Sequence, residues 1–139
     1  MRAIATVIAL LSVLAASTVR AEEADPAEAS AETRYVELKP TFVTNFGPTT
    51  TPRLMYIKTD VALRVFGSEG EKAAEHHLPA LRNALVLLLS KQSESAVITG
   101  EAREYVREQA LAELQEILVA EEGEALIEDL LFTNFIVQR

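Results

Sequence analysis

The sequence predicts an α+β protein in which an antiparallel or mixed sheet of long strands packs against two or three helices. Residues 53–66 alternate between apolar and polar side chains, with the period of two that a half-buried strand requires. Residues 81–89 and 102–118 each carry an apolar stripe at helical spacing. Residues 125–138 follow a glycine and form a second long apolar segment, which is typical of a strand.

The N-terminal segment, residues 1–21, has the pattern of a secretory signal peptide. It begins with Met1 and the charged Arg2, continues with an apolar run over residues 3–16, and ends in small residues. We expect cleavage between Ala21 and Glu22. The alternative is a weak membrane anchor, because residues 3–19 just reach the lower limit of the roughly 17 to 25 residues that span a bilayer. Either interpretation places the protein in the periplasm, free or associated with the inner membrane.

Composition predicts one folded domain behind an acidic linker. Residues 22–33 hold five acidic residues and no large apolar side chain, so we expect them to be disordered and the domain to occupy residues 34–139. A chain of 139 residues has room for one such domain. The formal net charge of −8 disfavours nucleic acid and anionic lipids as partners, and membrane contact is expected only if the N-terminal segment is uncleaved. The absence of Cys excludes disulfides and thiol chemistry.

The first half of the domain is expected to be mostly extended. Residues 34–38 predict a short strand that ends near Pro40, residues 41–46 a second extended piece, and residues 45–52 a loop between strands. The strand over residues 53–66 then presents two different faces. The apolar face carries Met55, Ile57, Thr59, Val61, Leu63 and Val65, and the other face carries Tyr56, Lys58, Asp60 and Arg64.

A helical period follows from residue 71 to residue 91. Ser68 is its expected N-cap, and Pro79 should kink or break the helix. The most buried part should be the stripe over residues 81–89.

The rest of the domain should be one more helix and a strand. After a short connection at residues 95–98, Thr99 is expected to cap a helix that runs to about residue 120, with Gly123 in the left-handed conformation behind it. The final strand, residues 125–138, has apolar side chains on both faces. We therefore expect it to be central in the sheet or to meet another subunit.

No spacing of reactive residues in the sequence indicates catalysis or a metal site. The two histidines, His76 and His77, are adjacent and project about 100° apart on a helix, whereas a zinc site on one helix face needs a spacing of four. Glu128 and Asp129 are neighbours that should point to opposite sides of a strand, although Asp129 shares an apolar face and a role for it stays open. We expect no catalytic residue, metal ligand or cofactor, and a role in binding other proteins.

Four segments, taken in order, resemble the flagellar basal body-associated protein FliL family. They read YVEL with Pro40 and FVTN over residues 35–45, YIKTDVAL over residues 56–63, HLPALRNAL running into LLS over residues 77–90, and LFTNFIVQ over residues 131–138. The resemblance covers about residues 34–139. It implies a domain similar to the stomatin-type (SPFH) domain, without catalytic activity, that assembles into rings around the periplasmic linker of the flagellar stator protein MotB and supports torque generation.

The resemblance also implies a binding surface. Six residues from the resembling segments are candidates for contact with a partner or with further copies of the chain: Tyr56, Lys58, Arg82, Asn83, Phe132 and Asn134. Typical family members have a firm transmembrane helix, from which the short Ala-rich run departs, so a cleaved chain would be a soluble paralogue. The alternatives are an SPFH-like self-assembling scaffold unrelated to flagella and a periplasmic domain that binds a small ligand or metal.

Overall fold

The computed structural model describes residues 32–50 and 52–139. The expected signal peptide, its cleavage point between Ala21 and Glu22, and nearly all of the expected linker lie outside these residues. The described chain forms an antiparallel four-stranded sheet and four helices, so the expected α+β class is confirmed. The elements are β1 (Thr33–Glu37), β2 (Phe42–Phe46), β3 (Met55–Phe66), α2 (Gly67–His76), α3 (Leu78–Ser90), α4 (Glu94–Ile98), α5 (Gly100–Glu122) and β4 (Ile127–Gln138).

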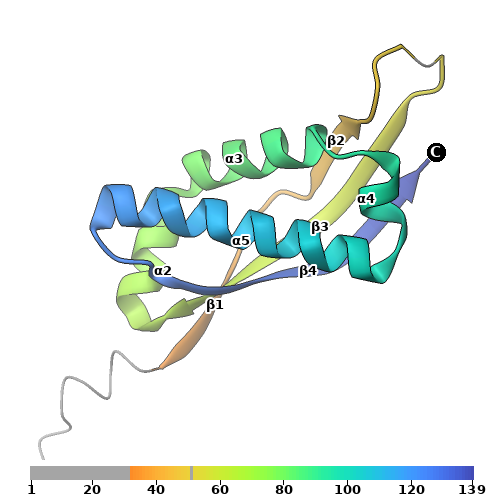
Figure 1. Ribbon diagram of the computed structural model, residues 1–139. Helices are drawn as coiled ribbons and strands as arrows, with labels where there is room; N and C mark the ends of the chain where they lie inside the picture. The colour runs from red at the N-terminus through yellow and green to blue at the C-terminus, as the bar shows by residue number, and fades with distance from the viewer. Residues whose placement is uncertain (1–31, 51) are drawn as a thin grey trace, which may run out of the picture.

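The sheet is organised around β3. Strand β4 pairs with one side of β3, while β1 and β2 pair end to end with the other side, opposite residues 62–66 and 55–59 of β3. Figure 1 shows α2, α3 and α5 in front of the sheet, all on the same side. The domain therefore has two layers, with the core between the helices and one face of the sheet.

The alternation predicted for β3 is confirmed. Its core face is buried, from Ile57 at 0% exposure to Val65 at 0%, and it includes Thr59, the buried polar side chain of the described core. The helices supply the opposite side of this core through aliphatic stripes, which include Leu81, Leu85, Leu89, Leu114 and Leu118. Apolar side chains that recur every second residue on β3 thus pack against those that recur about every 3.6 residues on the helices, and together they form one apolar layer.

The helical region departs from the expected pattern at its start and agrees with it at Pro79. Helix α2 begins at Gly67 directly after β3, and no side chain caps it, so the expected Ser68 cap is wrong. The expected break at Pro79 is confirmed, because α2 ends at His76 and α3 starts at Leu78 with Pro79 in its first turn. Proline suits this position because the first backbone amides of a helix have no partner within it.

The approach to the final strand is more helical than expected. Residues 95–98, expected as a connection, lie in the short helix α4. Both ends of α5 agree with the prediction: Thr99 Oγ1 accepts a hydrogen bond from the backbone amide of Ala102 at 3.1 Å, and Gly123 adopts φ +84° behind the last turn.

The expected central position of the last strand is wrong, because β4 pairs only with β3 and lies at the edge of the described sheet. Two register shifts explain the misleading pattern, one opposite Asp60 and Val61 and one opposite Arg64 and Val65. Each shift inserts an unpaired residue into β4 and moves the side chains that follow to the other face. Apolar residues that belong to one face therefore occur at both odd and even positions.

Candidate interaction surface

The helices leave one face of the sheet uncovered in the described structure. Two cross-strand rows occupy its end near the β2–β3 connection. One row joins Val43, Lys58 and Ile136, and the next contains Tyr56. The three apolar side chains are exposed, Val43 at 63%, Ile136 at 46% and Tyr56 at 37%, and Lys58 makes no ion pair with any described residue. A surface that combines an unpaired cation with exposed apolar groups is suited to contact with another protein.

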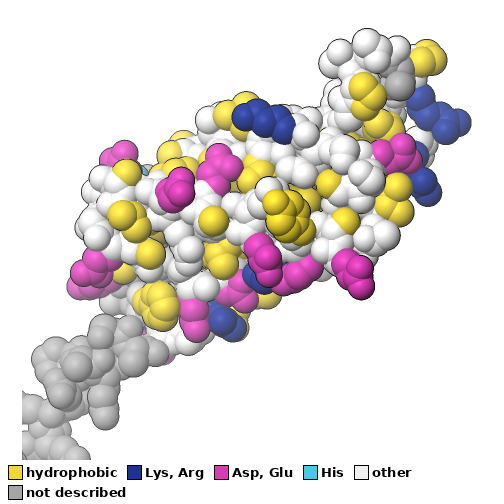
Figure 2. Space-filling view, viewed as in Figure 1, with side chains coloured by type: hydrophobic (Ala, Val, Ile, Leu, Met, Phe, Trp, Pro, Cys, Tyr) yellow, Lys and Arg dark blue, Asp and Glu magenta, His cyan; other side chains and the backbone are white. Residues whose placement is uncertain are grey.

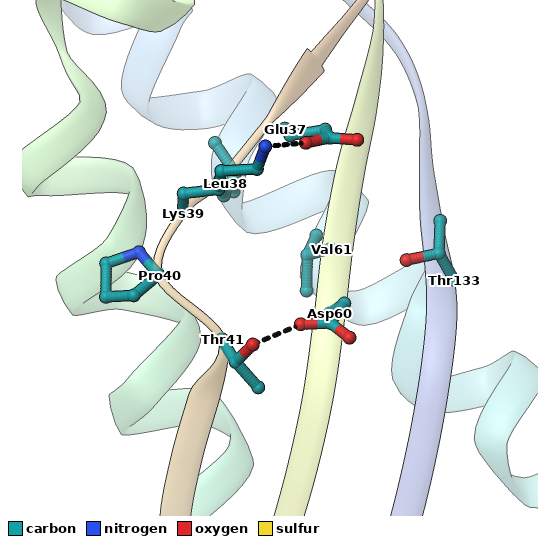
Figure 3. A pocket seen from close by; sticks show the side chains of 8 residues that line it. All are labelled: Glu37, Leu38, Lys39, Pro40, Thr41, Asp60, Val61 and Thr133. Carbon is teal, nitrogen blue, oxygen red and sulfur yellow. Dashed lines mark hydrogen bonds and ion pairs between the residues drawn. The ribbon is translucent and has the colours of Figure 1, made fainter.

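A hollow of about 510 Å³ lies next to these rows, where the chain passes from β1 to β2. Figure 3 shows Lys39 reaching back to Glu37 and Thr41 reaching Asp60 across it. The hydrogen bond to Glu37 raises the pKa of Lys39. Asp60 also accepts a hydrogen bond from Asn134, so its carboxylate is engaged on both oxygens. The hollow offers polar contacts through a hydroxyl, a carboxylate and an ammonium group.

Arg82 ties this passage to α3 from the helical side. Its guanidinium donates hydrogen bonds to the carbonyl oxygens of Leu38 and Pro40, both at 2.6 Å, and stacks over the ring of Phe42 at 4.1 Å. These contacts hold β1 and β2 in line beside β3. The neighbouring Asn83 is exposed on α3.

The first half of the β4 edge, Ile127–Leu130, is closed by side chains. Gln115 of α5 donates a hydrogen bond to the carbonyl of Ile127 at 2.8 Å, and Arg107 donates to the carbonyl of Leu130. The Asp129 carboxylate accepts from the amide of Leu130 and forms an ion pair with Arg107. These side chains satisfy backbone groups that an added strand would otherwise use.

Asp129, whose role the sequence left open, is therefore part of this closure. The expectation that Glu128 and Asp129 point to opposite sides is wrong, because both carboxylates reach Arg64, at 3.0 and 3.8 Å. The register shift opposite Arg64 accounts for this convergence, since it interrupts the regular alternation of β4 at these two residues.

The second half of the β4 edge borders another hollow, of about 500 Å³, beneath the start of α5. Phe132 and Phe135 line it with rings that meet edge to face at 5.0 Å. Arg103 of α5 also lines it, with its guanidinium 5.2 Å from the centre of the Phe135 ring. The hollow is also lined by Arg107 and by its two ion-pair partners, Glu104 and Asp129. It therefore combines aromatic surface with paired charges and with Arg103.

The two histidines lie between the helices and away from both hollows. Their rings meet edge to face at 4.7 Å, and His77 Nε2 lies 2.7 Å from a carboxylate oxygen of Glu122 at the end of α5. Within residues 32–50 and 52–139, no group of three or more His, Cys, Asp or Glu side chains is arranged to hold a metal ion.

The structure divides the six candidate residues between three places. Tyr56, Lys58 and Asn134 share the uncovered sheet face, whereas Phe132 pairs with Val61 and faces the hollow beneath α5. Arg82 and Asn83 lie on α3, on the other side of the sheet (Figure 1). Val43, Ile136 and Arg103, which line the uncovered face and the hollow beneath α5, were not among the candidates from sequence.

The helical side of the molecule is mainly acidic. Figure 2 shows this side, where Asp and Glu side chains lie along the border formed by α5 and Lys or Arg side chains are fewer. Glu101, Glu104, Glu108 and Glu116 of α5 are all exposed. Among the described helices, none combines the length and the hydrophobicity that crossing a membrane requires.

Comparison with known proteins adds one finding to this geometry. The model of a family described as flagellar basal body-associated protein FliL matches residues 35–138. No curated protein matches the chain at a significant level.

Proposed function

Because the chain belongs to the FliL family of flagellar basal body-associated proteins, we propose that it is a non-enzymatic protein-binding subunit that supports the flagellar stator from the periplasm. The family match carries this proposal. It runs from within β1 to the last residue of β4 and so includes the whole of the sheet except its first two residues.

The proposed partners are a stator protein with a MotB-like periplasmic linker and further copies of this chain. The uncovered sheet face supports a binding role, because it exposes Val43 and Ile136 on either side of the unpaired Lys58. Apolar groups exposed together on a small domain commonly mark a contact with another protein.

Export of the domain is part of the proposal. Residues 1–21 would direct the chain to the periplasm and be removed before Glu22, or remain as a weak anchor in the inner membrane. N-terminal sequencing of protein recovered from periplasmic and membrane fractions decides between these forms. A cytoplasmic chain that begins at Met1 would contradict export altogether.

Deletion of the gene tests the role in the motor. We expect reduced spreading in soft agar and a larger loss of swimming speed in viscous medium, because stator support matters most under load. Wild-type motility in both media would contradict the proposal.

Complementation makes this test specific to the uncovered face. The double variant Val43→Asp/Ile136→Asp should express but fail to restore motility, because it places charges where an apolar contact is proposed. Lys91→Glu, an exposed change on the helical side, is the matched control and should restore motility. Equal rescue by the two variants would show that motility does not depend on the uncovered face.

A further inference from the structure

The edge of β4 is closed along one half and open along the other. Gln115, Arg107 and Asp129 occupy the backbone of the first half. Along the second half, Phe132–Gln138, the described hydrogen bonds from side chains to the backbone are confined to the one that Thr59 makes with the carbonyl of Asn134. We call this second half the open edge. An open strand edge offers a row of backbone donors and acceptors to an added strand.

The opposite side of the sheet is divided into two short strands, β1 and β2, of five residues each. Arg82 occupies the carbonyl groups of Leu38 and Pro40 where β1 passes into β2. The amide of Gly47, just beyond β2, donates to the carbonyl of Gln92 at 3.2 Å. These bonds tie the ends of the two short strands to α3 and to the turn that follows it, so neither strand presents as long a row as the open edge, and strand addition is favoured at β4.

We propose that the open edge binds an extended, acidic segment of a partner protein by strand addition, with apolar side chains of that segment entering the hollow beneath α5. This inference rests on the proposed function, because it specifies the kind of partner segment that the binding subunit recognises. Backbone hydrogen bonds supply affinity in such complexes, and pockets for alternate side chains supply specificity.

The register of β4 predicts the pattern of the added segment. A residue opposite Ile136 would continue the row of Val43, Lys58 and Ile136 on the uncovered face. Adjacent strands lie about 4.8 Å apart, so this residue is two strands, or roughly 10 Å, from the backbone of Lys58 and within reach of the lysine side chain. A carboxylate is therefore favoured at this position.

The next residues of the segment would face the helical side, because side chains alternate along a strand. There they meet the hollow lined by Phe132, Phe135 and Arg103. Arg103 donates to the carbonyls of Val97 and Ile98 and lies over the Phe135 ring, so it suits an aromatic side chain of the segment. The recognised segment should thus alternate acidic side chains with aromatic or large aliphatic ones.

Charge argues against a second copy of this chain as the occupant. The edge that a second copy would add, residues 132–138, contains no carboxylate that could pair with Lys58. A partner segment that carries carboxylates supplies this missing charge.

Fluorescence anisotropy with three labelled peptides tests the proposal on the full chain. The first probe is a peptide of roughly nine residues that alternates glutamate with valine around one phenylalanine. The second replaces glutamate by lysine, and the third is the acidic peptide with alternate backbone amides methylated. We expect the acidic peptide to bind at least about tenfold more tightly than either of the others, because only it has both the charge and the backbone donors.

Variants and amide exchange locate the binding site. Lys58→Glu should weaken binding of the acidic peptide by about tenfold, whereas Lys91→Glu, which makes the same charge change away from the edge, should leave it unchanged. Arg103→Gln should weaken binding less, by about threefold, because it removes a cation that faces the phenylalanine of the peptide and not its carboxylates. Bound acidic peptide should slow hydrogen exchange at residues 132–138. Because Arg103 also holds the end of α4, Lys58→Glu remains the decisive variant if Arg103→Gln unfolds.

Four results would overturn the proposal. Equal affinity for the acidic and basic peptides would remove its chemical basis, and equal effects of Lys58→Glu and Lys91→Glu would move the site elsewhere. A dimer that Ile136→Lys dissociates would assign the edge to a second copy. Protection of residues 132–138 that is lost on deletion of residues 22–31 would assign it to the chain's own acidic segment. These assays use purified protein, so a motility defect without peptide binding refutes the edge proposal and leaves the proposed function in place.

Discussion

Thr59 provides a test of how the open edge is held in register. Its side chain is fully buried in the middle of β3, and its hydroxyl donates a hydrogen bond of 2.6 Å to the carbonyl oxygen of Asn134. That carbonyl lies beside the register shift opposite Asp60 and Val61. Replacement by valine keeps the shape of the side chain and removes the donor, so it isolates the hydrogen bond.

The expected loss of stability follows from two opposing effects. A buried carbonyl that loses its partner costs about 1–3 kcal/mol. A methyl group in place of the hydroxyl recovers up to about 0.8 kcal/mol, because it is more easily buried. With the full offset, Thr59→Val should lower the free energy of unfolding by about 0.2–2 kcal/mol. For a domain of this size, each kcal/mol lowers Tm by roughly 4–8 °C.

Urea unfolding followed by circular dichroism measures this change, with Thr44→Val as the matched control. Thr44 is half-buried on the core side of β2, and its hydroxyl lies 3.3 Å from the carbonyl oxygen of Asn45 in an exposed bond. We expect Thr44→Val to change stability by less than about 0.5 kcal/mol. Equal stability of Thr59→Val and Thr44→Val would refute the reasoning, as would unchanged hydrogen exchange at residues 132–138 in Thr59→Val.

Three further predictions concern α5. Gly123→Ala should lower the free energy of unfolding by about 1–2 kcal/mol, because Gly123 adopts φ +84°, which is unfavourable for alanine. Gly100→Ala is the control and should not lower it, because the backbone at Gly100 is unstrained and a methyl group there meets no other atom. Thr99→Ala should cost about 0.5–2 kcal/mol through loss of the N-cap, and Thr99→Ser should restore most of it; both are measured by urea unfolding. The hydrogen bond from Arg107 lowers the pKa of Glu104 below its ordinary value of 4.5. The stability that Glu104 contributes is therefore present above that pH and lost as pH falls through the folded-state pKa, so Glu104→Gln should flatten the decline of Tm below about pH 4.5.

The correct predictions from sequence concern features that neighbouring residues determine. The two faces of β3 follow from the strict alternation of apolar and polar residues. The break between α2 and α3 follows from Pro79, because a proline ring clashes with a preceding helical turn. The ends of α5 follow from Thr99 and Gly123 in the same way. Each of these signals acts within about four residues and needs no knowledge of the rest of the fold.

The incorrect predictions concern features that distant residues determine. Gly67 adopts φ +58° and its amide donates to the carbonyl of Glu32 at 2.7 Å, across the β1 end of the sheet, so the chain turns from β3 into α2 before it reaches Ser68. Strand β4 appeared central because its register shifts depend on pairing with β3. A pattern of hydrophobicity along one segment cannot report the unpaired residue that such a shift inserts.

The candidate surface could be predicted only in part for the same reason. Tyr56, Lys58 and Asn134 were candidates because they lie in the segments that resemble the family, and the structure places them together on the uncovered sheet face. Val43 and Ile136 were missed because each is an ordinary apolar residue in its own segment, and only the pairing of three strands brings them to either side of Lys58. A sequence signal did exist for Val43, since it alternates with the buried Phe42 and thus points away from the core.

The net charge of −8 and the proposed affinity for an acidic segment are compatible, because they act over different distances. The net charge repels a large polyanion, which meets the whole surface, including the exposed glutamates of α5. At physiological ionic strength, however, charges farther apart than about 8 Å are largely screened from one another. A carboxylate opposite Ile136 on the open edge would lie within reach of the Lys58 side chain, which forms no ion pair with any described residue. A negative overall charge and the proposed selection of an acidic peptide by Lys58 are therefore compatible in one protein.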